Sequence, residues 1–285
     1  MNTLKTGLLM AVLTALLVAI GQAVLGTKGA LFFLIIALGM NLFSYYYSDK
    51  MTIAMTKSRP LSQEEAPDIH EIVERLAVKA GIPKPRVYLT PMAQPNAFAT
   101  GRNPQHAAVA VTDGLMRLLN REEIEGVLAH EIAHIKNRDI LVSTIAAALA
   151  GAITMIANVL QWGLIFGMGR GDDEGEGIGG LLGTLVMIIV APLAAMLVQM
   201  AISRSREYLA DAVGAHLSGN PDGLANALLK LEQAAHRIPS QVNPAASHMF
   251  IVHPLSAQSM ANLFSTHPPI KDRVERLRKM RIGIS

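Results

Sequence analysis

The pentapeptide His-Glu-Ile-Ala-His at residues 130–134 combines residue types and a spacing that are typical of zinc sites. On an α-helix, residues i and i+4 lie on one face with Cβ atoms roughly 5–6 Å apart. His130 and His134 can therefore each offer a ring nitrogen to one tetrahedral ion, and the Glu131 carboxylate can reach a water molecule beside it. The pattern predicts a zinc site with its own general base. The alternative is a polar helix face with two solvated histidines.

The third protein ligand must be His, Glu or Asp, because the sequence contains no cysteine. The best candidate is Glu207, which is followed by Asp211 one helical turn later. Glu207 would bind the metal, and Asp211 would accept the free ring N–H of a liganding histidine. The same charges could instead form a solvated helix face, with Glu207 paired to Arg204 or Arg206. The residues alone leave both interpretations open.

Four motifs, taken in order, resemble the HtpX family of integral-membrane zinc metalloproteases, which are bacterial relatives of the prenyl-protein endopeptidases. The motifs are NAFATG at 96–101, HEIAH at 130–134, REYLAD at 206–211 and HPP at 267–269. The similarity extends over nearly the whole chain. It implies that Glu207 is the third zinc ligand and that the protein cleaves misfolded or damaged membrane proteins in a stress response.

The expected reaction is hydrolysis of a peptide bond. Zinc would polarise the scissile carbonyl and lower the pKa of a bound water to about 7. Glu131 would accept the water proton and pass it to the leaving amine. Two rival classes are an inactive zinc-binding membrane scaffold and a small transporter. The transporter is suggested by Asn158, Gln161 and Gln199 in apolar segments, but it leaves the metal ligands unexplained.

The segment of residues 96–101 is predicted to be an edge strand followed by a turn. An unpaired edge beside the metal can bind an extended peptide as a further strand, and the residues expected to do so are Asn96, Ala97, Phe98 and Ala99. Without the resemblance a simple hairpin is the better interpretation, and with it the substrate role is favoured. The resemblance also suggests that His267 stabilises the oxyanion, the alternative being a capping or surface histidine.

The composition indicates a membrane protein. Hydrophobic residues make up 51% of the chain and charged residues 16%, whereas soluble domains carry about 25% charged residues. Four apolar segments, each near or above the ~20 residues that cross a bilayer, account for the excess. They are residues 7–25, 30–47, 140–168 and 178–202. The first could instead be a cleaved signal peptide.

Charges beside these segments predict the topology. Basic residues lie just after the second segment, before the third and after the fourth, whereas the connection at 170–177 is acidic and rich in glycine. Because His130 and Glu207 would bind one ion, the two segments between them must form a hairpin. We therefore expect a multi-pass protein of the bacterial inner membrane, with its active site facing the cytoplasm. The expected partners are the lipid bilayer and membrane-protein or unfolded-protein substrates. No basic stripe with interleaved aromatic residues points to nucleic acid.

The predicted fold is mainly α-helical, with four hydrophobic helices and a cytoplasmic α+β domain of the zincin type that contains a small sheet. The domain combines residues 48–139 and 203–285. Hydrophobic periodicity, caps and breakers predict its elements. Helices are expected at 67–80, 121–138, 203–218, 221–235 and 270–280, strands at 86–89 and 107–112, and a loop that shapes the cleft at 238–266.

Overall fold

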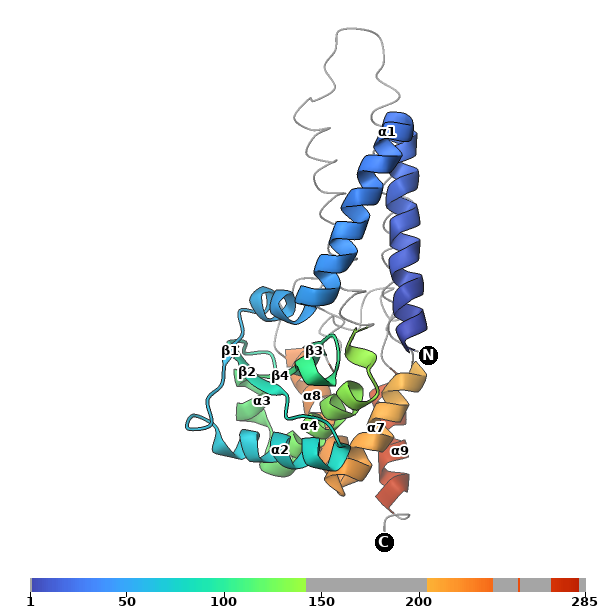
Figure 1. The fold of residues 1–285 in the computed structure, drawn as a ribbon. Helices are drawn as coiled ribbons and strands as arrows, with labels where there is room; N and C mark the ends of the chain where they lie inside the picture. The colour runs from blue at the N-terminus through green and yellow to red at the C-terminus, as the bar shows by residue number, and fades with distance from the viewer. Residues whose placement is uncertain (1, 142–203, 238–250, 252–267, 282–285) are drawn as a thin grey trace.

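The computed structural model of the 285-residue chain describes residues 2–141, 204–237, 251 and 268–281 (Figure 1). A long helical hairpin stands on a mixed unit of helices and one sheet. Almost all of the predicted third segment, the whole fourth segment, nearly all of the loop at 238–266 and His267 lie outside the described residues.

Helix α1 (Asn2–Met55) consists of two arms that meet at Gly26, where φ is 64° and ψ is −152°. Glycine adopts this left-handed φ without the strain that a Cβ would impose. The arms run side by side (Figure 1), and the Asn41 side chain in the second donates to Thr14 Oγ1 in the first at 2.9 Å. The first two predicted apolar segments are therefore both helical, and the second continues beyond residue 47.

One helix in the described part of the chain, Gly26–Met55, is long and apolar enough to cross a membrane, with a mean hydropathy of 1.7. Of the four hydrophobic helices predicted from the sequence, the described part of the chain therefore contains one candidate membrane span. The last turns of α1 bury Ser48, Asp49 and Thr52, so this end of the helix packs against the mixed unit.

The sheet has four strands in the order β1-β2-β4-β3. They are β1 (Arg59–Pro60), β2 (Arg86–Thr90), β3 (Ala97–Gly101) and β4 (Ala107–Thr112). Strand β4 is buried throughout and pairs parallel to β2 and antiparallel to β3. The strands predicted at 86–89 and 107–112 are confirmed, and β3 lies at the edge of the sheet as expected.

Helix α2 (Pro67–Ala80) begins at Pro67 and ends at Gly81, which adopts φ 70°, as the breakers predict. The short helix α3 (Asp113–Leu118) was not predicted from the sequence. Its N-cap is Thr112, the last residue of β4, whose hydroxyl accepts from the Leu115 N–H at 3.1 Å. One residue therefore ends a strand and starts a helix.

Helix α4 (Arg121–Lys136) lies at the centre of the unit, between α2 on one side and α7 (Arg204–Ser218) and α8 (Pro221–Arg237) on others. Its N-cap is Asn120, whose side chain and backbone exchange hydrogen bonds with Glu123. Helix α9 (Ile270–Met280) packs on α7 and α8. The apolar core is formed mainly by α2, α4, α8 and the sheet.

Candidate metal centre

The two histidines of the pentapeptide point to one place from the buried face of α4. His130 is 1% exposed, and its Nε2 lies 3.2 Å from His134 Nε2. Two nitrogens bound to one tetrahedral zinc at ~2.0–2.1 Å would lie about 3.3–3.4 Å apart. The ring orientation therefore fits a shared metal ion.

Glu207 on α7 completes a group of three possible ligands. One carboxylate oxygen lies 3.7 Å from His130 Nε2 and the other lies 3.5 Å from His134 Nε2. The ligand atoms of the three residues all lie within 4.8 Å of one another. Helix α7 can approach this closely because residue 214 is glycine, where an added Cβ would lie 2.9 Å from the His130 backbone nitrogen. The set has the chemistry of a zinc site with three protein ligands.

A carboxylate faces the other ring nitrogen of each histidine. Asp211 Oδ1 lies 3.0 Å from His130 Nδ1, and Asp139 Oδ2 lies 3.2 Å from His134 Nδ1. These contacts favour a proton on each Nδ1 and leave each Nε2 lone pair for a metal. Asp211 lies where it was expected. Asp139 was missed, although an aspartate five residues after the second histidine was a visible signal.

Arg273 on α9 was also missed by the sequence analysis. Its side chain is fully buried, donates to both oxygens of Asp211 at 2.8 and 2.7 Å, and lies 3.8 Å from Glu207. Burial raises the pKa of Asp211, but Arg273 and His130 outweigh it and bring that pKa to about 2. Arg273 therefore keeps Asp211 charged in the interior. The available signal was a lone arginine among Ile270, Val274 and Leu277 on the apolar face of a helix.

Among the residues that the structure describes, acidic side chains outnumber cationic ones around the histidines. Four carboxylates, those of Glu131, Asp139, Glu207 and Asp211, surround the pair, and two guanidinium groups accompany them, Arg273 on Asp211 and Arg206 at 4.0 Å from Asp139. Burial raises the pKa of Glu131 to about 7. Burial lowers the pKa of His134, but Asp139, Glu207 and Glu131 raise it to about 9. A divalent cation would supply the missing positive charge, so the residues fit a metal.

The edge strand β3 lies next to Glu131. The buried Glu131 carboxylate accepts a hydrogen bond from the backbone N–H of Ala99, which places the middle of β3 beside the metal cluster. Asn96, one residue before β3, is engaged elsewhere, because its backbone N–H and C=O both bond to Thr112 and its side chain accepts from the Ile251 N–H. The part of the expected substrate segment that lies beside Glu131 is therefore within β3 itself.

Comparison with known proteins agrees with this arrangement. The sequence profile of peptidase family M48 matches residues 63–281. The chain is 66% identical to the protease HtpX homolog of Pelotomaculum thermopropionicum over 99% of this chain and 100% of that protein. It is 55% identical to that of Syntrophobacter fumaroxidans (97% and 98% covered) and to that of Pyrococcus furiosus (98% and 97% covered). The crystal structure of S. mikatae Ste24p has the same fold, with a TM-score of 0.55 and 19% identity over 97% of this chain and 64% of that one.

A buried histidine pair with a carboxylate from a second helix, on a helical fold with a small mixed sheet, defines a metallopeptidase. The chain belongs to peptidase family M48 and, within it, to the HtpX family of membrane metalloproteases. Peptidases of family M48 are zinc-dependent in general. The resemblance stated from the four motifs is thereby confirmed, and so is the expected class of enzyme.

Proposed function

We propose that the chain is a membrane-embedded zinc endopeptidase that binds one Zn²⁺ through His130, His134 and Glu207. The observation that carries the proposal is the convergence of these three side chains, whose ligand atoms lie within 4.8 Å of one another. Asp211 and Asp139 orient the two imidazoles, and Arg273 holds Asp211 in place.

A zinc ion bound there would act as a Lewis acid on the scissile carbonyl and on the attacking water. Glu131, one residue after the first ligand and buried beside the cluster, accepts the water proton as the C–O bond forms. It then donates that proton to the leaving amine as the C–N bond breaks. In this proposal His267 stabilises the oxyanion of the tetrahedral intermediate.

The substrate binds in extended form along β3, with Ala97, Phe98 and Ala99 as the strand that receives it. Support comes from the position of β3 at the edge of the sheet and from the bond between its Ala99 N–H and Glu131. Backbone hydrogen bonds along a sheet edge tolerate many side chains. Such tolerance suits an enzyme that removes misfolded or damaged membrane proteins, the role proposed here.

The proposed location is the bacterial inner membrane, with several spans and a cytoplasmic active site. The helix Gly26–Met55 is apolar enough to span, and basic residues lie near its end at Lys50, Lys57 and Arg59. Positive residues favour the cytoplasmic side of a span. Residues 7–25, 140–168 and 178–202 supply the further spans, and residues 48–139 and 203–285 form the protease domain.

The test is Glu131→Gln, purified in detergent. We expect it to bind one zinc per chain and to lose casein cleavage by about 10²–10⁴-fold, because the base is gone while the ligands remain. Zinc content by elemental analysis and cleavage with and without a zinc chelator are measured on the same sample.

The matched control is Glu125→Gln. This carboxylate lies on the same helix but pairs with Arg75 at 2.9 Å instead of facing the cluster. It should keep full activity. Near-normal cleavage by Glu131→Gln would refute the assigned base. A wild-type protein that binds zinc but cleaves nothing would favour the inactive scaffold.

A further inference from the structure

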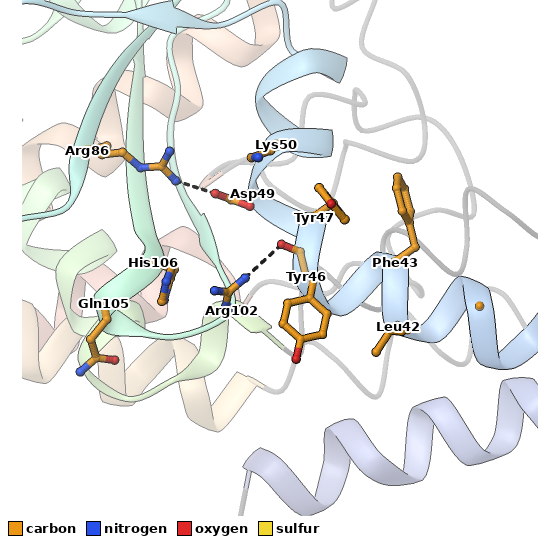
Figure 2. A pocket seen from close by; sticks show the side chains of 11 residues that line it. Leu42, Phe43, Tyr46, Tyr47, Asp49, Lys50, Arg86, Arg102, Gln105 and His106 are labelled. Atoms are coloured by element: carbon orange, nitrogen blue, oxygen red, sulfur yellow. Dashed lines mark hydrogen bonds and ion pairs between the residues drawn. The ribbon is translucent and has the colours of Figure 1, made fainter.

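A cavity of about 730 Å³ lies at the base of α1, where the helix meets the sheet. Figure 2 shows its walls: the last turns of α1 on one side, and β2 and the turn between β3 and β4 on the other. Its lining is Gly39, Leu42, Phe43, Tyr46, Tyr47, Asp49, Lys50, Arg86, Arg102, Gln105 and His106. None of these residues belongs to the metal centre.

The polar wall of the cavity is basic. Three of its residues, Lys50, Arg86 and Arg102, are cationic, and the one acid, Asp49, pairs with Arg86. Within the ranges that the structure describes, Lys50 and Arg102 form no ion pair with an acidic side chain. Arg102 donates to the carbonyl oxygen of Tyr46 at 3.2 Å and can bind a further acceptor through its remaining N–H groups. The wall therefore has an excess of positive charge.

The opposite wall is apolar and continues along α1. Exposed side chains at Leu31, Ile35, Leu38, Leu42 and Tyr46 follow the i, i+3/i+4 spacing of one helix face. This stripe leads from near the start of the helix Gly26–Met55 into the cavity. At the cavity, Arg102 lies over the Tyr46 ring at 5.2 Å and Lys50 over the Tyr47 ring at 5.3 Å. Tyrosines with neighbouring Lys and Arg are typical of the membrane–water interface.

We propose that this cavity binds the head group of an anionic phospholipid, with the acyl chains along the stripe on α1. Lys50 and Arg102 would contact the phosphate, and Gln105 would donate to head-group hydroxyls. The charge complements an anionic phosphodiester, and the stripe complements hydrocarbon. An extended peptide could occupy the same volume, but it has no need for two cations without acidic partners beside an apolar stripe.

Such a site would fix the distance between the sheet and the surface of the bilayer. Arg102, Gln105 and His106 follow β3 directly in the chain. A lipid held between them and α1 would tie the edge strand to the membrane surface. The proposal rests on the helix Gly26–Met55 lying in the membrane and does not depend on the metal.

The test uses the full-length, zinc-loaded protein in detergent and native mass spectrometry. Phosphatidylglycerol and phosphatidylcholine with the same chains are titrated separately into wild type and into Lys50→Gln/Arg102→Gln. We expect wild type to prefer phosphatidylglycerol and the double variant to bind it about tenfold more weakly or worse, since each basic residue near a lipid phosphate contributes to binding. Binding of phosphatidylcholine should change little.

The matched control is Lys271→Gln/Arg278→Gln, which removes the same charge from exposed positions on α9, away from the last turns of α1 (Figure 1). This control variant should keep the wild-type preference for phosphatidylglycerol over phosphatidylcholine. An equal loss in both variants, or no loss in either, would overturn the proposal. So would displacement of the lipid by glycerol 3-phosphate at similar concentrations, which would indicate a soluble phosphate ligand.

If Lys50→Gln/Arg102→Gln raised the KM for casein in lipid-free detergent and left phosphatidylglycerol binding unchanged, the cavity would be assigned to substrate. That result would overturn the proposal as well. Zinc content is measured on every sample. A failure of the metal assignment would therefore be recognised separately from a failure of the lipid site.

Discussion

Helix α4 makes two close contacts of different chemistry. Against α8 the backbones approach at Gly126, where an added Cβ would lie 2.4 Å from the Leu224 nitrogen, and apolar residues such as Leu228 surround the contact. Against α7 the approach is at Gly214, and the neighbouring side chains are ionisable. Apolar burial stabilises the fold directly, whereas buried charge costs desolvation that only complementary partners offset. The first contact therefore supplies stability, and the second holds the chemistry.

The variant expected to disturb the ionisable contact between α4 and α7 most strongly is Arg273→Met, because Arg273 on α9 pairs with Asp211 on α7. It leaves Asp211 charged and buried without the guanidinium that holds its pKa low, so we expect the free energy of unfolding to fall by about 3–5 kcal/mol. Thermal or denaturant unfolding in detergent measures the loss. A change below about 1 kcal/mol, which is typical of exposed ion pairs, would contradict the importance of this pair.

The double variant Arg273→Met/Asp211→Leu is the control for that prediction. Replacing both partners removes the buried charge, so much of the lost stability should return. Zinc affinity should stay low, because His130 no longer has a carboxylate at Nδ1. Recovery of both properties together would show that Asp211 does not position the ligand.

Asp139→Asn tests the other orienting carboxylate, with a zinc affinity expected to be about 10–100-fold lower. Zinc needs neutral His134, whose pKa is lowered by burial but raised to about 9 by its acidic neighbours. The wild-type affinity should therefore rise with pH and level off above about 9, once His134 has lost its proton. Without the Asp139 charge that pKa falls, and the rise should end at lower pH. Asp68→Asn, in an exposed pair with Arg121, should change neither quantity.

Two glycine variants test the contact of α4 with α8 and its contact with α7 separately. Their expected effects are smaller than those above. Gly126→Ala should cost about 1–2 kcal/mol of stability through overpacking against α8, partly offset by better helix propensity, and should leave zinc affinity unchanged. Gly214→Ala should instead weaken zinc binding, because α7 must move away from His130 and carries Glu207 with it. Unfolding curves and zinc competition with a chromogenic chelator measure both. The reverse pattern would contradict the division of roles along α4.

The sequence predicts well those elements whose signals are local. The bounds of α2 and α9 match the prediction, because their signals are local. Helix α2 has a proline at its start and Gly81 after its end, and α9 follows Pro269 and carries an apolar stripe. The predicted start of α4 at residue 121 is confirmed as well, and its capping box of Asn120 and Glu123 is a local signal. Strand β1, two residues long, and helix α3 were missed, since the first depends on pairing with β2 and the second shares its cap with a strand.

The site was predictable where spacing along one helix decides it. His130, Glu131 and His134 follow from the pentapeptide, and Glu207 with Asp211 from a second i, i+4 pair. Asp139 was missed although it lies only five residues after His134. Arg273 was not found, because its role depends on contact with Asp211, which is far away in the sequence. The basic cavity was missed for the same reason, as its wall combines α1 with the turn after β3.

The ion pair between Arg273 and Asp211 has a consequence for biosynthesis. It joins α9 to Asp211, which in turn contacts His130 on α4, so the cluster is complete only after α9 has been translated. A nascent chain that already displays the pentapeptide would still hold metal weakly. We therefore expect proteolytic activity to appear only after α9 has been synthesised and Arg273 has reached Asp211.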